Sequence, residues 1–115
     1  MADADTIRAG RQYSRQLDEA LDDLRHQVAA ASEAERQYRL TQGTLILEAP
    51  SGTVDQKRAW LNAECADARY LRDLADGLKQ AAVETVRSRR TQLSYVQSRL
   101  ANEREEAALA RTGPQ

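Results

Sequence analysis

The sequence predicts an all-α protein: an antiparallel two-helix hairpin of the coiled-coil type, which assembles into a dimeric four-helix bundle. Composition is the first observation, because only 4% of the 115 residues are aromatic, 30% are charged and none is Phe. Apolar residues also recur every three or four positions along two long stretches. A short segment with Pro50 and Gly52 separates these stretches and has the residues of a turn. Such a chain buries little surface alone, so we expect a homo-oligomer.

The first helix is expected from about residue 4 to about residue 48. Its apolar stripe has a 4-3-4-3 spacing, which is the a/d pattern of a coiled-coil helix. The clearest part of the stripe consists of Leu17, Leu21, Leu24, Val28 and Ala31. Gly43 is the weak point, since an interior glycine costs about 1 kcal/mol relative to alanine. If the last turns fray or break, we expect it there.

Residues 49–53 are predicted to form the turn. Thr53 is a good N-cap, and Gln56 three residues later completes a capping box. Asp55 in the first turn suits the positive end of a helix. A phosphate-binding loop would need a second glycine and a Lys-Ser/Thr pair after a strand, and this stretch has neither. A hairpin turn is therefore the interpretation.

The second helix is expected from about residue 54 to about residue 111, before a disordered tail at 112–115. Its stripe contains a stutter after Leu78, which locally relaxes a supercoil. A short turn makes the helices antiparallel, with facing residue numbers that sum to about 102. This register places Leu24 opposite Leu78 and Val28 opposite Leu74. The segment from about residue 99 onward then extends past the first helix, as a frayed tail or a docking helix.

Ten apolar residues of the two stripes are expected to form the seam between the helices or with a partner. They are Leu17, Leu21, Leu24, Val28, Leu71, Leu78, Val86, Leu93, Val96 and Leu100.

The register also predicts that two clusters of arginine meet at the open end of the hairpin, with two tyrosines beside them. The net charge of −1 gives no reason to expect nucleic acid, so any such binding must come from a local cluster of this kind. Arginines flanked by aromatic rings suit single-stranded nucleic acid. The alternative is structural charge, neutralised by neighbours such as Asp18 and Glu84. The candidate nucleic-acid-binding residues are Arg8, Arg11, Arg15, Arg87, Arg89, Arg90, Tyr13 and Tyr95.

No other residue type indicates catalysis, a cofactor or a metal. Trp60 and Tyr38 are interpreted as core residues near the turn, with Leu45 and Leu47 against Trp60. His26 lacks a ligand at metal spacing, and Cys65 lacks a histidine partner. We therefore expect a protein that is not an enzyme and has no small-molecule substrate. Without a signal peptide or an apolar run of roughly 20 residues, we expect no membrane contact and a cytoplasmic location.

Residues 35 to about 106 carry a family resemblance. The run EAERQYRL is followed by the apolar helix end LILEA, then SGTVDQKRAWLNAE, then the long segment ARYLRDLADGLKQAAVETVRSRRTQLSYVQSRL. These motifs resemble small helical-hairpin proteins encoded by tailed phages and prophages. The resemblance implies a cytoplasmic phage protein of the replication or recombination genes. Trp60 and Gly43 depart from the typical pattern, and the resemblance assigns no catalytic residue.

Two hypotheses of function follow. The first is a non-enzymatic phage accessory protein that binds single-stranded DNA, or a phage recombination protein, through the basic open end. The second is an oligomeric coiled-coil adaptor or inhibitor that binds a host or phage protein and no nucleic acid.

Overall fold

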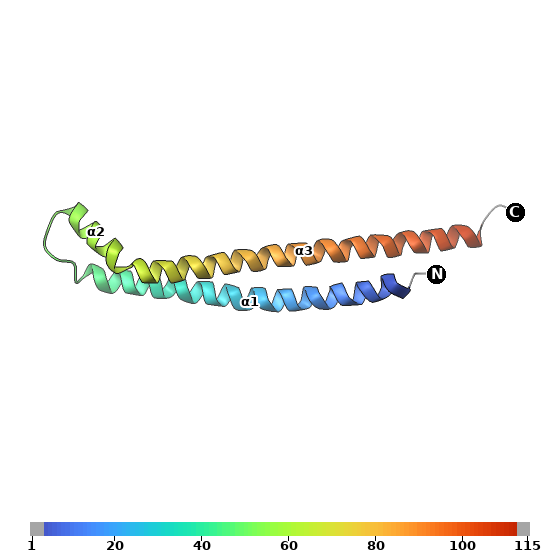
Figure 1. Ribbon diagram of the computed structural model, residues 1–115, viewed down its shortest axis with the longest axis horizontal. Helices are drawn as coiled ribbons and strands as arrows, with labels where there is room; N and C mark the ends of the chain where they lie inside the picture. The colour runs from blue at the N-terminus through green and yellow to red at the C-terminus, as the bar shows by residue number, and fades with distance from the viewer. Residues whose placement is uncertain (1–3, 113–115) are drawn as a thin grey trace. The chain divides into compact units, whose positions relative to one another are not determined.

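The computed structural model describes residues 4–112, which form three α-helices and no strand. They are α1 (Ala4–Ile46), α2 (Val54–Glu64) and α3 (Ala66–Arg111) (Figure 1). The all-α class is confirmed. The chain divides into two compact units, and both α1 and α3 contribute to each. Unit 1 contains the described residues 4–23 and 83–112, and unit 2 contains residues 24–82.

Helix α1 is continuous through Gly43 and ends at Ile46, two residues before the expected end. It closes with tighter turns, in which the amide of Glu48 donates to the carbonyl of Leu45 at 2.9 Å. A side chain at position 43 would meet nothing within 4 Å. Gly43 therefore neither breaks the helix nor serves a close contact in it.

The predicted cap of the next helix is confirmed. The amide of Gln56 donates to Oγ1 of Thr53 at 3.1 Å, and the amide of Thr53 donates to Oε1 of Gln56 at 2.9 Å. This reciprocal pair satisfies two of the amides that the start of any helix leaves without a partner.

The prediction of a single second helix is wrong, because the helix breaks at Cys65. The backbone of Cys65 leaves the helical region (φ −89°, ψ 2°), and its side chain is fully buried. The guanidinium of Arg69 donates to the carbonyl and the side-chain oxygen of Asn62, at 3.4 and 3.3 Å. The last carbonyls of a helix have no amide donor within the helix. Arg69 supplies a donor to one of them near the end of α2.

Helix α3 has no stutter, which is a second correction. Its buried and half-buried residues keep one heptad frame, because Arg72 and Lys79 replace Leu71 and Leu78 in the seam. Long basic side chains can do this, since their stems pack on apolar surface while the charged ends reach out. The seam positions are Ala68, Arg72, Ala75, Lys79 and Ala82 in unit 2, then Val86, Arg89, Leu93, Val96, Leu100, Glu103 and Ala107 in unit 1.

The register also differs from the predicted one, although the two helices run in opposite directions within each unit. In unit 1 the hydroxyl of Thr6 donates to Glu103 at 3.2 Å, and Gly10 lies against Val96. In unit 2 Glu35 lies 3.8 Å from Arg72. Facing residue numbers therefore sum to roughly 106 to 109, about one to two helical turns away from the predicted sum of 102. The connection is longer than expected, because α1 ends early and α2 intervenes before α3.

Candidate interaction surfaces

The arginines near the start of α1 lie on the outer face of unit 1. Arg8 is two residues from both Thr6 and Gly10, which pack against α3, and two residues correspond to about 200° around a helix. Its side chain is 79% exposed and pairs with Asp5 at 3.5 Å. Arg8 therefore points away from α3.

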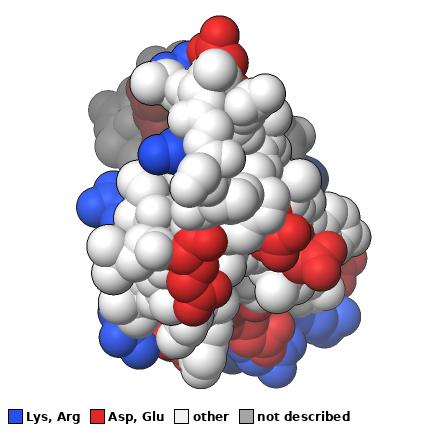
Figure 2. Space-filling view, turned by 90° about the vertical axis from the view of Figure 1, so that its left-hand side faces the viewer, with Lys and Arg blue, Asp and Glu red and all other residues white. Residues whose placement is uncertain are grey.

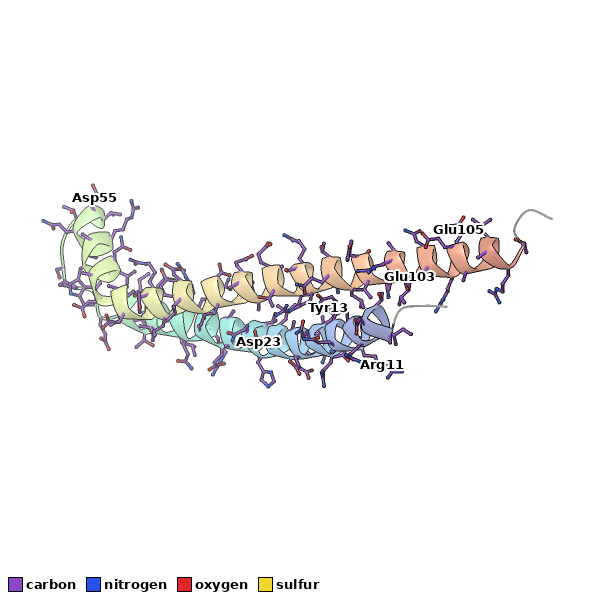
Figure 3. All side chains as sticks on the ribbon, turned by 45° about the vertical axis from the view of Figure 1, so that its right-hand side comes forward. Arg11, Tyr13, Asp23, Asp55, Glu103 and Glu105 are labelled. Carbon is purple, nitrogen blue, oxygen red and sulfur yellow. The ribbon has the colours of Figure 1, made fainter. Side chains whose placement is uncertain are left out.

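Arg11 and Arg15 share that outer face. Arg15 is exposed and lies two residues from both Tyr13 and Leu17, which are half-buried. In Figure 3, Arg11 extends from the edge of α1 that faces away from α3, whereas Tyr13 lies between the two helices.

The arginines of α3 have separate surroundings. Arg87 donates to Glu84 at 2.6 Å on the surface of unit 1. Arg89 is half-buried in the seam and donates to Gln92 at 3.1 Å. Arg90 is exposed. The expected cluster of three is therefore two surface arginines and one seam residue.

A shallow hollow on the outer face of α3 joins these two surface arginines to Tyr95, which is 67% exposed. Ser98 also lines the hollow and is two residues from both Val96 and Leu100 of the seam. Two residues correspond to about 200°, so the hollow faces away from α1.

The prediction that the two arginine clusters meet is therefore wrong. The three arginines of α1 face away from the seam, as do Arg87 and Arg90 of α3, while Arg89 lies in the seam, so the exposed arginines occupy opposite outer faces of unit 1. Only the tyrosines come together: Tyr13 and Tyr95 line one groove of about 360 Å³ with Thr6 and Arg99. The register predicts only which residues lie at the same level along the two helices. It does not predict whether their side chains point toward the same side of the hairpin.

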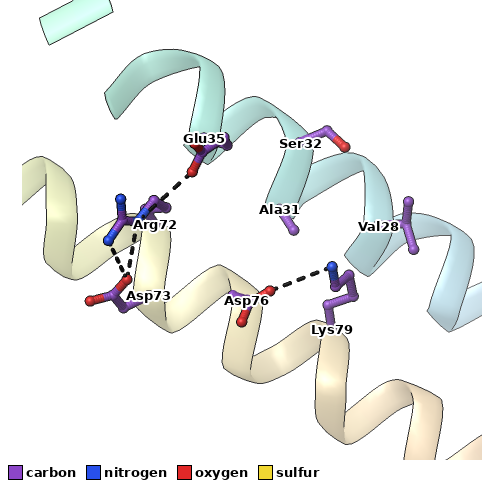
Figure 4. A pocket seen from close by; sticks show the side chains of 8 residues that line it. All are labelled: Val28, Ala31, Ser32, Glu35, Arg72, Asp73, Asp76 and Lys79. Carbon is purple, nitrogen blue, oxygen red and sulfur yellow. Dashed lines mark hydrogen bonds and ion pairs between the residues drawn. The ribbon is translucent and has the colours of Figure 1, made fainter. Parts of the chain in front are cut away.

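One side of unit 2 is polar. The guanidinium of Arg72 donates to Asp73 at 3.0 Å and lies 3.8 Å from Glu35 (Figure 4). It also lies 4.2 Å from the centre of the Tyr38 ring. The hydrogen bond to Asp73 raises the pKa of Arg72. Arg72, Asp73 and Glu35 line a groove between α1 and α3, and in the same groove Lys79 pairs with Asp76 at 3.4 Å. Charged seam residues of α3 are therefore partnered on this side.

The other side of α3 in unit 2 is apolar. At 100° per residue, the charged residues between positions 68 and 82 all fall on one half of the helix. They are Arg69, Arg72, Asp73, Asp76 and Lys79. The opposite half contains the seam alanines Ala68, Ala75 and Ala82 and, outside the seam, a surface here named the leucine face, which consists of Tyr70, Leu71, Leu74, Gly77, Leu78 and Ala81.

The large residues of the leucine face are exposed. Leu71 is 58% exposed, Leu74 47%, Leu78 49% and Tyr70 66%. The residues of unit 2 that are buried are Cys65 and Ala82, both small. Unit 2 therefore lacks a core of large side chains while it exposes a continuous apolar surface, which is typical of an interaction site.

A groove of about 580 Å³ lies between the leucine face and α1, and its α1 edge has one charged residue, Glu33, beside Ala30, Ala34, Gln37 and Thr41. There Glu33 accepts from Arg36 at 3.1 Å and from Gln37 at 2.9 Å. The hydrogen bonds from Arg36 and then Gln37 lower the pKa of Glu33 from 4.5 to about 2.

A second exposed apolar surface lies around the turn. Leu47 is 87% exposed, Val54 72% and Ile46 58%. Figure 2, which looks onto this end, shows a broad uncharged surface with charged side chains around and between its parts. Trp60 is half-buried, but the exposure of Leu47 contradicts the expectation that Leu47 covers it.

The predicted seam residues divide into two groups. Val86 and Val96 are 4% exposed, and five others are half-buried: Leu17, Leu21, Leu24, Leu93 and Leu100. Val28, Leu71 and Leu78 are exposed, so they do not pack between the helices of one chain. Sequence reasoning placed these three in a seam between the helices or with a partner, and it set Leu74 opposite Val28 without including Leu74, Tyr70 or Gly77 among the seam residues. The signal that could have found them is the division of α3 into a charged half and an uncharged half.

His26 is exposed and Cys65 is buried. Within residues 4–112 no group of three or more His, Cys, Asp or Glu is placed to hold a metal ion. None of the described helices is both long and apolar enough to cross a membrane.

Comparisons with models of protein families, with curated proteins and with solved structures found no match.

Proposed function

We propose that this chain is a non-enzymatic coiled-coil interaction protein, a helical hairpin that acts by binding another protein chain through the leucine face of unit 2. The observation that carries the proposal is the exposure of Leu71, Leu74 and Leu78 in a unit that buries only small side chains. Association would supply the core that unit 2 lacks. In this proposal the hairpin contributes to an assembled helical bundle.

The energetic argument supports a complex through this face. Covering the exposed half of one leucine side chain stabilises by about 1 kcal/mol. Three leucines and Tyr70 therefore contribute several kcal/mol to any complex that covers them. No charged group of α3 between positions 68 and 82 must lose its water in the process, because all five lie on the other half of the helix.

The test places a photoreactive amino acid at Leu74 in cells that produce the protein. Irradiation is expected to give covalent adducts from position 74. The matched control is position 80, because Gln80 is exposed on the charged half of the same helix. Equal adduct yields from both positions, or none from position 74, would contradict the proposal.

A second candidate function is binding of single-stranded DNA in phage replication or recombination, as the resemblance implies. The observation that favours it is the exposed ring of Tyr95 beside Arg87 and Arg90 on the outer face of α3. An exposed ring can stack on a base while guanidinium groups contact phosphates.

Fluorescence anisotropy with a labelled single-stranded oligonucleotide tests this second candidate. Changing Arg87, Arg90 and Tyr95 to alanine should abolish binding at low salt. Changing Arg8 and Arg15 to alanine is the control, because these arginines lie on the opposite outer face. If both sets of changes weaken binding equally, the attraction is general charge and the candidate site is wrong.

A further inference from the structure

We propose that a second copy of this chain covers the leucine face, with α3 packed antiparallel against α3 of the partner and the two Leu74 side chains meeting at the two-fold axis. This inference rests on the proposed function and names its partner. It is argued from unit 2 alone.

The chemistry of the leucine face selects an uncharged partner surface. Between Ala68 and Ala82 it has no charged residue and no hydrogen-bonding side chain except the Tyr70 hydroxyl. A charged partner surface would lose its water here without gaining a hydrogen bond. In a two-fold dimer the same patch faces itself, so an uncharged face meets an uncharged face.

Gly77 gives the face a shape that fits its own copy. This glycine lies inside α3, where it costs about 1 kcal/mol relative to alanine. A side chain added there would meet nothing within 4 Å in one chain, so no contact inside the chain requires glycine. When Leu74 meets Leu74 of the partner subunit, antiparallel packing places Leu71 over Gly77 of the partner subunit. A large residue then fills the space above a small one, on both sides of the axis.

The α1 edge of the groove is a poorer partner for the leucines. Glu33 there is ionised and held by Arg36 and Gln37. A leucine ridge over that edge would remove the carboxylate from water. When α3 pairs with α3 of the second copy, the hydrogen bonds of Glu33 with Arg36 and Gln37 stay at the edge of the interface, in contact with water.

The size of the face sets the strength of the pair. The exposed parts of Tyr70, Leu71, Leu74 and Leu78 amount to roughly 400 Å² per copy, about half of what each partner buries in a standard interface and typical of a weak, transient complex. The dimer is therefore expected to form at micromolar concentrations and to dissociate on dilution.

The experiment measures mass by light scattering on the purified full chain over a dilution series. We expect a mass that rises toward twice the 12.9 kDa of one chain. Leu74→Arg should weaken association by about tenfold or more. Gln80→Arg, an exposed change on the charged half of α3, should not. Circular dichroism on both variants checks that helix content is unchanged.

The geometry is tested by a disulfide and by a charge swap. Leu74→Cys should form a disulfide between two chains, because the two-fold axis brings its copies together. The parent chain should not, since Cys65 is fully buried. Leu71→Glu and Gly77→Arg should each weaken self-association, and an equimolar mixture should recover it, because the mixed dimer pairs Glu with Arg on one side and Leu with Gly on the other.

Two results would overturn the inference and leave the proposed function standing. The first is a monomer at all concentrations up to about 100 µM, while Leu74 still gives adducts with a different protein in cells. The second is a dimer that neither forms the Leu74→Cys disulfide nor responds to the charge swap. Absence of adducts from position 74 would instead contradict the proposed function itself.

Discussion

Gly52 lies where a methyl group would collide with the capping box. A Cβ at this position would come within 2.6 Å of Oε1 of Gln56, the atom that accepts from the amide of Thr53. The φ angle of Gly52 is not positive, so it is this contact, and not the backbone, that opposes a side chain at position 52.

Gly52→Ala is therefore expected to displace the Gln56 carboxamide and to destabilise the start of α2 by about 1 kcal/mol. Amide hydrogen exchange across α2 measures this effect. Ser51→Ala is the control, because Ser51 is an exposed neighbour outside the box. Equal exchange rates in the two variants would show that the carboxamide adapts without cost.

The lowered pKa of Glu33 predicts that the stability of the fold depends on pH. Its pKa of about 2, set mainly by the hydrogen bond from Arg36, lies below the ordinary value of 4.5. A lowered pKa means that the folded state favours the charged form. The stabilisation is complete above about pH 4.5 and is lost as the pH falls toward 2. Since the side chain of Glu33 is 57% exposed, the effect should be small and should weaken with salt.

Arg36→Gln should move the carboxyl pKa of Glu33 up toward 4.5. NMR titration of the side-chain carboxyl carbon measures it directly, with Arg39→Gln as the matched control because Arg39 pairs with Glu35. A titration midpoint that stays near 2 in Arg36→Gln would mean that the arginine is not the main cause.

At the scale of the element, glycines inside the long helices have unequal roles. A Cβ on Gly10 would lie 3.3 Å from Cγ1 of Val96, which is tighter than an ordinary contact, whereas one on Gly43 would meet nothing within 4 Å. The same substitution should therefore have different effects at the two positions.

Gly43→Ala is expected to stabilise the protein by up to about 1 kcal/mol, through helix propensity. Gly10→Ala should lose most of that gain or reverse it, because Val96 must move. Thermal unfolding followed by circular dichroism compares the two at equal protein concentration. An equal gain at both positions would mean that the helices separate enough at Gly10 to admit a methyl group.

The elements also define how far the sequence alone could lead. The cap at Thr53 was predicted correctly, because it depends on residues three apart in the chain. The break at Cys65 was missed, since neither glycine nor proline marks it. The choice between Leu71 and Arg72 as the seam residue of α3 was also missed. Both residues lie between Ala68 and Ala75 at a spacing that a heptad allows, and the apolar one was predicted to lie in the seam.

At the scale of the whole molecule, association should couple to stability. If the chain pairs through the leucine face, its unfolding temperature rises with protein concentration, because mass action favours the folded dimer. Calorimetry at concentrations spanning about two orders of magnitude measures this. The slope should vanish in Leu74→Arg and persist in Gln80→Arg. A concentration-independent unfolding temperature in the parent chain would contradict coupling between pairing and folding.

The sequence by itself determined what depends on neighbours along the chain: the all-α class and the capped start of α2. Hydrogen bonds and side-chain contacts within one helical turn decide these features. In unit 2 the tertiary structure decided the rotation of α3 about its axis, and this rotation left the leucines outside the seam. A rotation of about 100° exchanges Leu71 for Arg72 in the seam. Since that exchange preserves the heptad spacing, only packing against α1 could decide it.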